Sequence, residues 1–400
     1  MTSRGRLALA LGCATYLAAW AFGSTPLYPV ALGLLAAVLI ARLWTRLASS
    51  PAELRRRLPE VERHEGDDVK VRLELKRSRG YLPSTVLLRE RIAKLGERET
   101  PLPMRRGSSY VLESLPRGRY VFEESTIVIE DPLGLDRIEE PLEAPGALLV
   151  YPRLVELDRL FSESGASAHD GKRLLLRRPA GFDLHSVREY EQGESLRKVH
   201  WRSTAKRGQL MVKELEDSPR NEVAVVLDVD PSAVVGESFE VQVRAAGSIL
   251  LAHARRGRRA VLLANSARVE QRRTRSADRD WRQALDLLAS VEPGPGPPLA
   301  ALLVDKDGGG GSAFELAIVT ASLPATLVEQ LLNLAVGHHR HVSLVLVDSA
   351  SFASNGSGAH SAHPGLLKLQ AAGIPVAVLR RGDDLAAKLG PHTAREAAFG

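Results

Sequence analysis

Two carboxylates and a hydroxyl follow one apolar segment in the second half of the chain. Asp228, Asp230 and Ser232 come directly after residues 223–227, a continuous apolar run that predicts a β-strand covered on both faces. Carboxylate and hydroxyl oxygens are the ligands that a hard cation such as Mg²⁺ prefers. The carboxyl end of a parallel strand is where α/β proteins place ligand sites. These three residues are therefore a candidate metal site.

A complete metal site would also need oxygen ligands from later loops. Residues 318–322 read Ile-Val-Thr-Ala-Ser and place no Asp at the expected end of the next strand. We therefore expect a site without a cofactor. A Mg²⁺-dependent enzyme or a metal-dependent adhesion-type binding module that uses Asp228, Asp230 and Ser232 is the alternative.

The second candidate is the highly charged segment 181–216, which also contains aromatic residues. Arg188, Arg197, His200 and Trp201 lie at its centre. These side chains suit a surface for protein–protein interaction, since Trp and Arg are common anchors. The other interpretation is a structural clasp, in which Arg and Glu pair and Trp201 fills the gap between two domains. The segment shows no nucleophile with an adjacent base, so catalysis is not expected.

Other clusters give weaker signals. His338, His339 and His341 lack a further ligand pattern for zinc and predict a solvated loop. The basic run 255–259 has no aromatic stacking partners and predicts a solvated helix end, so no nucleic acid partner is expected. The net charge of +6 is spread along the chain, and Cys13 is the only cysteine, which excludes a disulfide within one chain.

The N-terminal segment of the chain is apolar, and we expect it to anchor the rest of the protein in a membrane. No residue from Leu7 to Ala41 is charged. This stretch exceeds the roughly 20 residues of one transmembrane helix and is interrupted by Gly-Ser-Thr-Pro at 23–26. The sequence predicts two spans, from Leu7 to Phe22 and from Leu27 to Leu43, in the lipid bilayer.

Arginines on both sides of this hairpin indicate its orientation. Arg4 and Arg6 precede the first span, Arg42 and Arg46 lie at the end of the second, and the turn between the spans has no charge. Positive residues stay on the cytoplasmic side. We expect a multi-pass protein of the cell membrane with both termini in the cytoplasm. A cleaved signal peptide is the rival interpretation, and the second apolar run argues against it.

The soluble region changes its hydrophobic period twice. Residues 69–75 alternate as a half-buried strand does, and further runs at 85–92, 110–115, 119–124 and 125–130 predict an antiparallel β-sandwich. From residue 221, strands alternate with helices, which predicts a doubly wound α/β domain. The expected organisation is a transmembrane hairpin at 1–44, a basic juxtamembrane connector at 45–65, a β-rich domain at 66–152, a signature segment and linker at 153–220, and an α/β domain at 221–400.

Three separate motifs resemble one bacterial family. Residues 188–206 resemble the signature R-E-Y-x-x-G-D-D-x-R-x-I-H-W-K-x-x-A-R of the domain of unknown function 58, and Glu194-Ser195 stands where the family has its Asp pair. The residues that match in register are Arg188, Glu189, Tyr190, Gly193, Arg197, His200, Trp201 and Ala205. Upstream, residues 117–120 and 131–135 match the family elements R-G-x-Y and D-P-x-G-L.

The resemblance implies an architecture and a set of partners. The family has two membrane spans, a β-rich domain and a von Willebrand factor A-like domain, whose metal motif D-x-S-x-S is similar to residues 228–232 with Asp230 at the first Ser position. It is found with MoxR-type AAA+ ATPases and transglutaminase-like membrane proteins. We therefore expect a membrane-anchored scaffold or adaptor that acts with such an ATPase in assembling envelope-associated complexes.

Overall fold

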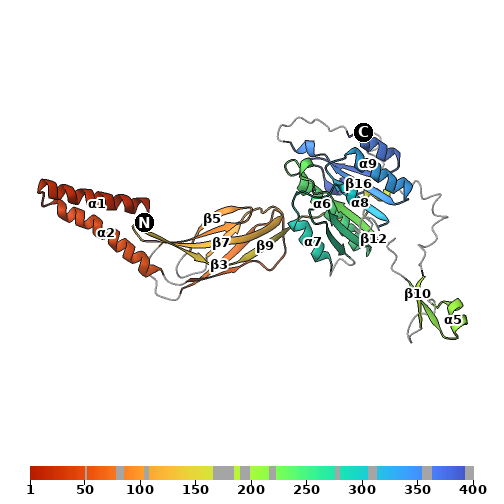
Figure 1. Cartoon of the computed structure of the whole chain (residues 1–400), viewed down its shortest axis with the longest axis horizontal. Helices are drawn as coiled ribbons and strands as arrows, with labels where there is room; N and C mark the ends of the chain where they lie inside the picture. Colours follow the sequence, from red (N-terminus) through yellow and green to blue (C-terminus); the bar gives the residue numbers. More distant parts are fainter. Residues whose placement is uncertain are drawn as a thin grey trace. The chain divides into compact units, whose positions relative to one another are not determined.

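The structure, a computed structural model, divides into two compact units, Met1–Tyr151 and Pro152–Gly400. It describes residues 1–49, 52–77, 85–102, 108–164, 184–189, 199–215, 222–274, 280–304, 313–353 and 363–391. Figure 1 labels several helices and strands in each unit. The expected sequence of two apolar helices followed by β and mixed α/β sheets is confirmed at this level.

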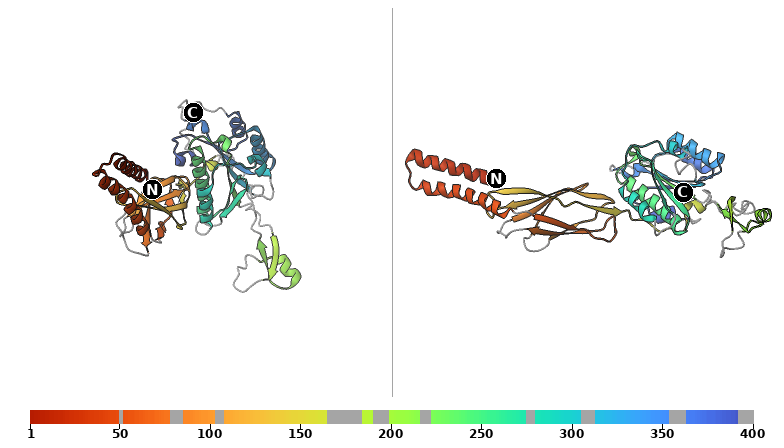
Figure 2. Two further views of the ribbon diagram at one scale, coloured as in Figure 1. Left: turned by 60° about the vertical axis from the view of Figure 1, so that its left-hand side comes forward. Right: turned by 60° about the horizontal axis from the view of Figure 1, so that its bottom comes forward.

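The first unit begins with a helical hairpin. Helices α1 (Ser3–Phe22) and α2 (Leu27–Ala48) run side by side in Figures 1 and 2, and both are long and apolar enough to cross a membrane. Gly23 ends α1 in the left-handed region with φ 61°. Both helices extend beyond the apolar spans expected from the sequence, because the flanking turns that contain arginine continue the helix instead of ending it.

Two β-sheets complete this unit and share one hydrophobic cluster. The smaller sheet has the order β1-β3-β6, and the larger has the order β2-β9-β7-β4-β5 with β8 also paired to β7. The strands are β1 (Ala52–Arg57), β2 (Arg63–His64), β3 (Val69–Arg77), β4 (Thr85–Ile92), β5 (Gly96–Pro101), β6 (Ser108–Leu112), β7 (Gly118–Glu130), β8 (Arg137–Leu142) and β9 (Gly146–Tyr151). Their pairs are antiparallel except for β2 with β9.

Two expectations for this region were wrong. Residues 45–65 do not form a separate connector, because α2 continues to Ala48 and β1 pairs with β3 from Ala52. Residues 119–130 do not form two strands but the single strand β7. No Gly or Pro interrupts this strand, and its two halves pair with different neighbours, β9 first and then β8.

A buried ion pair holds one of the three arginines of β1, Arg56, inside the unit, while Arg55 and Arg57 stay 56% and 68% exposed. Arg56 and Glu90 have side chains that are 2% and 1% exposed, and they form an ion pair and hydrogen bond between β1 and β4. The Arg56 guanidinium also lies 3.9 Å from the centroid of the Phe122 ring. The Tyr110 hydroxyl donates to the second Glu90 oxygen at 2.6 Å. Burial, with the adjacent Glu90 carboxylate, raises the pKa of Tyr110, so it remains a donor. This network joins the two sheets.

The second unit is built on a doubly wound sheet with the order β14-β13-β12-β15-β16-β17. The strands are β12 (Glu222–Leu227), β13 (Arg259–Ala264), β14 (Glu270–Thr274), β15 (Glu315–Thr320), β16 (His341–Val347) and β17 (Val376–Leu379). All neighbouring pairs are parallel except β13 with β14. The order reverses at β12, whose neighbours are β13 and β15. This is the topological switch point, where α/β sheets bind ligands.

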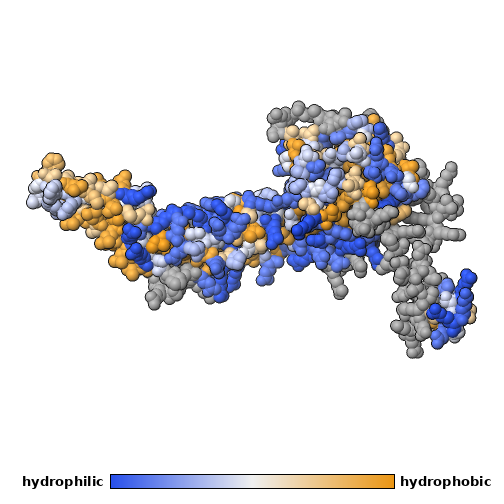
Figure 3. Space-filling view, in the orientation of Figure 1, coloured by the Kyte–Doolittle hydropathy of each residue, from blue (hydrophilic) through white to orange (hydrophobic). Residues whose placement is uncertain are grey.

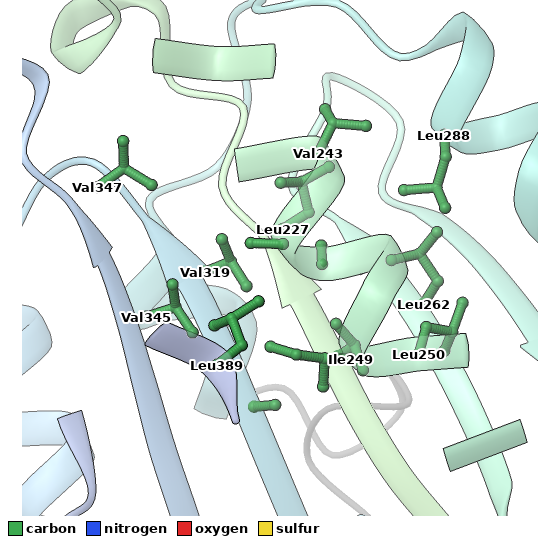
Figure 4. Close-up of a cluster of buried hydrophobic side chains, with 14 of the residues drawn as sticks. Leu227, Val243, Ile249, Leu250, Leu262, Leu288, Val319, Val345, Val347 and Leu389 are labelled. Atoms are coloured by element: carbon green, nitrogen blue, oxygen red, sulfur yellow. The ribbon is translucent and has the colours of Figure 1, made fainter. Parts of the chain in front are cut away.

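Helices cover both faces of this sheet. One hydrophobic cluster contains residues of α6 (Ser238–Arg255), α7 (Trp281–Ser290) and α11 (Leu385–Leu389). The other contains residues of α8 (Leu299–Val304), α9 (Ala325–Leu332) and α10 (Pro364–Ala371). Along β12, Val225 and Leu227 enter the first cluster and Ala224 and Val226 the second. Figure 4 shows the first cluster, with Leu227, Val319 and Val345 from three strands pointing toward α6.

The segment that enters this unit packs on α6. Leu157, Leu160 and Phe161, the first residue of α3 (Phe161–Ser164), belong to the hydrophobic cluster of the sheet. Gly247 of α6 allows this approach, because a Cβ there would lie 2.5 Å from the Leu154 side chain. Residues 152–164 are therefore part of the α/β unit and not of the linker that was expected to begin at 153.

The basic run 255–259 is also more ordered than the sequence predicts. Arg255 forms two bonds with Glu156, at 2.5 and 2.6 Å, and Arg256 pairs with Glu163. Arg258 bonds Glu315 at 2.5 Å. These arginines tie the entering segment and β15 to the end of α6, so they are not a purely solvated face.

Replacing Glu90 by Gln tests the buried network of the first unit. The change leaves the Arg56 guanidinium buried without its counter-charge, which costs about 3 to 5 kcal/mol. We expect faster hydrogen exchange throughout β4 and β7 of the micelle-bound chain. The control is Glu99→Gln, which removes an exposed partner of Arg89 on the neighbouring strand β5 and costs at most about 1 kcal/mol. Equal exchange in the two variants would contradict the structural role of the network.

The buried His253 on α6 predicts a pH dependence in the second unit. Burial, opposed by Glu315 and assisted by Arg258, lowers its pKa from 6.5 to about 4. The folded protein therefore keeps the imidazole neutral while the unfolded chain binds a proton near pH 6.5, so stability is lost as pH falls from about 6.5 toward 4. The loss reaches about 3 kcal/mol.

Urea denaturation followed by circular dichroism at several pH values measures this effect. We expect His253→Gln to flatten the dependence of the midpoint on pH in this window. His64→Gln, in the first unit, is the control and should leave the slope unchanged. A slope that is the same in wild type and in His253→Gln would show that another group is responsible.

Candidate functional site at the switch point and in the signature segment

Asp228 is the centre of a hydrogen-bond cluster at the switch point. It follows the last residue of β12 and is 7% exposed. Its Oδ1 accepts from Asn265 Nδ2 at 2.8 Å and from the Asp230 backbone N–H at 3.2 Å. Its Oδ2 accepts from the Thr320 hydroxyl at 2.7 Å. The carboxyl ends of β12, β13 and β15 therefore meet through one carboxylate, which we call the Asp228 node.

The partners of Asp228 are themselves fixed. The Asn265 Oδ1 accepts from the Val229 backbone N–H at 2.7 Å, and the Thr320 hydroxyl oxygen accepts from the Ser322 N–H at 2.9 Å. The Pro/Gly stretch before α8 passes directly over the node, because a Cβ on Gly296 would lie 1.6 Å from the Asn265 carbonyl oxygen. Only a glycine permits this close approach.

Asp230 and Ser232 do not join this cluster through their side chains. Asp230 is exposed, and its Oδ1 accepts from the Ser232 backbone N–H at 2.9 Å, which caps a short 3₁₀ turn at Pro231–Ala233. The three residues that the sequence grouped are therefore divided, with Asp228 buried in the node and Asp230 acting as a local cap.

The donors around Asp228 do not favour a divalent cation. Oδ1 already accepts two hydrogen bonds and Oδ2 accepts one, so a metal would have to compete with these donors for the carboxylate. Within the described residues no group of three or more His, Cys, Asp or Glu side chains could hold a metal ion. The donor set of the node fits a closed structural cluster, and we derive no chemistry through a metal.

The sequence reasoning missed two polar residues at this edge of the sheet. Asn265 follows β13 and supplies the amide that Asp228 binds. Asp348 follows β16 and is 4% exposed, with its Oδ2 at 3.6 Å from Arg380 Nε. Both follow an apolar strand directly, as Asp228 does. A polar residue after each predicted strand was the signal that could have identified them.

The signature segment forms a small β–α–β arrangement in the described residues. Strand β10 (Leu184–Glu189) pairs antiparallel with β11 (Met211–Leu215), and α5 (Trp201–Arg207) lies between them in sequence. Arg188 and Glu189 thus belong to β10, opposite Val212 and Met211. Tyr190, Gly193 and Arg197 lie outside the described residues.

His200 acts as the cap of α5. Its Nδ1 accepts from the Ser203 N–H at 3.3 Å and lies 2.8 Å from the Ser203 hydroxyl oxygen. Its backbone N–H donates to Met211 at 2.7 Å, and Met211 N–H donates to the Thr204 hydroxyl at 3.0 Å. The imidazole therefore caps the helix, while the His200 backbone N–H and the Thr204 hydroxyl hold the helix against β11. The contact of the imidazole with Ser203 spans one helical turn, as capping contacts do.

Trp201 begins α5 and lies at the surface of the part of the chain that the structure describes. Its side chain is 66% exposed, and Arg202, Lys206 and Arg207 on the same helix are exposed too. The helix rests on β11 through its capping residues instead. An indole that remains exposed in this way fits the alternative interpretation, an interaction surface.

Comparison with known families agrees with the motifs of this segment. Residues 186–305 match the family model of the protein of unknown function DUF58. The chain contains a DUF58 segment. This segment extends from β10 to the end of α8 and includes His200, Trp201, Asp228 and Asn265. The resemblance noted for residues 188–206 is therefore confirmed, whereas the match does not include the upstream motifs at 117–120 and 131–135, and the family itself has no established activity.

Similarity to individual proteins is limited. The uncharacterized protein YeaD of Bacillus subtilis (strain 168) is 29% identical over 146 residues, which is 36% of this chain and 35% of that protein. The chain thus matches about a third of the length of this relative. A conjugative transposon lipoprotein from Bacteroides eggerthii DSM 20697 is 14% identical, covers 22% of this chain and 96% of its own, and has a TM-score of 0.15. That score is too low to support an argument about fold.

Replacing Asp228 by Ala tests whether the node is structural. The variant removes the carboxylate that the Asn265 amide and the Thr320 hydroxyl share, and leaves them only their contacts with the Pro297 and Ser322 carbonyl oxygens. We expect a loss of about 3 kcal/mol in urea denaturation. Asp230→Ala, the control, removes an exposed cap and costs about 1 kcal/mol. Mg²⁺ should leave the midpoint of the wild type unchanged. A midpoint that Mg²⁺ raises in wild type but not in Asp228→Ala would establish a metal site instead.

Proposed function

We propose that this protein is a non-enzymatic scaffold of the bacterial cell membrane, anchored by α1 and α2, with both termini in the cytoplasm. It would act with a MoxR-type AAA+ ATPase in assembling envelope-associated complexes. The observation that supports this proposal best is a folded soluble region attached to a hairpin whose apolar side chains face outward.

The surface of the hairpin supports membrane insertion. Leu7, Trp20 and Leu39 are 70%, 73% and 70% exposed, which water would penalise and lipid would not. In Figure 3 the hairpin is largely orange, and blue residues gather where it meets the β-strands. Helices of 20 and 22 residues extend about 30 Å each, the thickness of a hydrocarbon core.

The positions of the arginines support the proposed orientation. Arg4, Arg6, Arg42 and Arg46 all lie at the end where α1 begins and α2 ends, which is also the end joined to the β-sheets. The opposite end, residues 23–26, has no charge. The positive-inside rule then assigns the arginine-bearing end and the soluble units to the cytoplasm.

The sheets support the finer architecture that the family resemblance implies. Two antiparallel sheets that share one hydrophobic cluster are consistent with a β-sandwich in the first unit. In the second unit, five parallel strands with the antiparallel β14 at one edge are consistent with a von Willebrand factor A-like domain. In such a domain the Asp228 node would occupy the place of the metal site and close it with hydrogen bonds.

The engaged side chains favour binding over catalysis. Asp228 accepts three hydrogen bonds, and the His200 imidazole caps a helix, so neither is poised as a base. A nucleophile–base pair also requires a third group that orients the base. In the part of the chain that the structure describes, the His200 imidazole bonds Ser203 and no carboxylate. The exposed Trp201 on α5 of the DUF58 segment is instead the best anchor for a protein partner. A transglutaminase-like membrane protein is a further expected member of such a complex.

Co-purification from native membranes tests the partnership. The full chain is cross-linked in its own cells, and the MoxR-type ATPase recovered with it is quantified. We expect Trp201→Ala to weaken the complex by about 2 kcal/mol, roughly 30-fold in affinity, as for a typical interface anchor. Leu367→Ala is the matched control, because Leu367 is 72% exposed on a helix outside the DUF58 segment.

The outcomes separate two parts of the proposal. If the wild type repeatedly recovers no ATPase, the partnership itself is wrong. If Trp201→Ala recovers as much ATPase as Leu367→Ala, the partner binds a surface other than α5.

A further inference from the structure

The loop after β7 is rigid and presents one leucine at its tip. Asp131, which is 3% exposed, accepts the backbone N–H of Asp136 at 2.6 Å and that of Leu133 at 2.8 Å through its two oxygens. Gly134 completes the turn in the left-handed region with φ 66° and donates its N–H to the Asp131 carbonyl. Despite these constraints, Leu133 is 64% exposed. An apolar side chain is thus held outward by a fixed loop.

Direct contacts attach this loop to the hairpin. The Thr2 backbone N–H and hydroxyl lie 3.2 and 3.0 Å from the Leu135 carbonyl oxygen, and the hydroxyl lies 2.7 Å from that of Gly134. At the end of α2, the buried Thr45 hydroxyl donates to Asp136 Oδ2 at 2.7 Å. These bonds reach both helices, so the loop has a defined position at the arginine-bearing end of the hairpin.

Gly5 makes this contact possible. A Cβ at Gly5 would lie 2.0 Å from the Leu135 carbonyl oxygen, so α1 and the loop touch backbone to backbone. The Arg4 guanidinium lies beside the loop, 3.9 Å from the position of a Cβ on Gly134. Leu7, where the apolar surface begins, lies three positions after Arg4, which is about 4.5 Å of helix rise. The loop is therefore close to the depth at which a membrane interface would lie.

We propose that Leu133, together with the exposed Arg4, Arg42 and Arg46, forms a collar that binds the headgroup region of the bilayer that the hairpin spans. Leu133 enters the interfacial layer, and the arginines pair with phosphates, preferentially those of anionic lipids. This inference rests on the proposed membrane anchoring. It adds that the β-sheets of the first unit contact the membrane surface through the loop after β7.

The continuity of the surface supports lipid as the occupant. Exposed apolar side chains of α2 continue beside the arginines, at Leu43 and Leu47, which are 57% and 62% exposed. Leu133 adds an exposed apolar side chain on a loop bonded to the ends of both helices. Apolar tips flanked by Arg are a common way for proteins to bind anionic membranes.

Thiol accessibility in the full chain tests the collar. The only natural cysteine, Cys13, is replaced by Ala, and single cysteines are placed at Leu133, Leu95 and Leu39. Each variant is reconstituted as one chain per nanodisc, in phosphatidylcholine alone or mixed with phosphatidylglycerol. Its reaction with a polar, membrane-impermeant maleimide is timed and divided by the rate in denaturant.

The control positions are matched to the geometry. Leu95 is 42% exposed in the turn after β4, and Thr85, at the other end of this strand, pairs with Glu130 next to the loop. The strand of eight residues places Leu95 about 26 Å from the collar. Leu39 lies near the middle of α2 and reports membrane insertion itself.

We expect the thiol at 133 to react severalfold more slowly than that at 95, and more slowly still with phosphatidylglycerol, while the thiol at 39 does not react. If the thiol at 39 is protected but that at 133 reacts like that at 95, the collar is wrong and the anchor stands. If the thiol at 39 reacts like that at 95, the membrane anchoring is wrong. Because each nanodisc holds a single chain, protection at 133 cannot arise from a second copy.

Discussion

A carboxylate that is removed from water must be met by hydrogen-bond donors, and the main junctions of this protein meet that requirement. Glu90 joins the two β-sheets through Arg56 and Tyr110. Asp136 joins the loop after β7 to α2 through Thr45. Asp228 joins three strands of the α/β sheet through Asn265 and Thr320. Each acid lies between elements that are distant in sequence, so each fixes tertiary and not local structure.

The same requirement explains why the switch point lacks the features of a metal centre. A cation and a set of N–H and O–H donors are alternative ways to satisfy one buried carboxylate. At Asp228 the donors come from the ends of β13 and β15, and the glycine-rich segment before α8 covers them. At the position where α/β proteins often bind ligands, the described side chains of this protein instead hydrogen-bond the ends of three strands to one another. The exposed aromatic and basic side chains of the DUF58 segment lie instead on α5, around Trp201.

Much of the secondary structure could be predicted, because hydrophobic periodicity reports local burial. The strands β4 and β12 lie within one residue of their expected positions, and strands alternate with helices beyond residue 221 as expected. The edge strand β14 could not be recognised because it is mostly polar, and the helices α8 and α11 could not because six and five residues are too few to show a helical period. Residues 55–57 were expected to lie in a basic connector, because no sequence pattern shows that the Arg56 guanidinium packs over the face of the Phe122 ring.

In the candidate site, too, some residues could be found from the sequence, but their contacts could not. Asp228 was found from its place after an apolar strand, but Asn265, 37 residues away, bonds it only because parallel pairing aligns the ends of β12 and β13. His200 and Trp201 were found as motif residues, and their opposite environments, one engaged as a cap and one exposed, follow from how α5 rests on β11.

The sequence by itself determined which segments are apolar, where the arginines flank them and which motifs the chain shares with the DUF58 family. These properties depend on residues that are adjacent along the chain. Only the tertiary structure decided which charges are buried, which partner satisfies each of them, and that Leu133 lies beside the hairpin. Those outcomes depend on the meeting of distant segments, because burial and hydrogen bonding are properties of the space around a side chain and not of its neighbours in sequence.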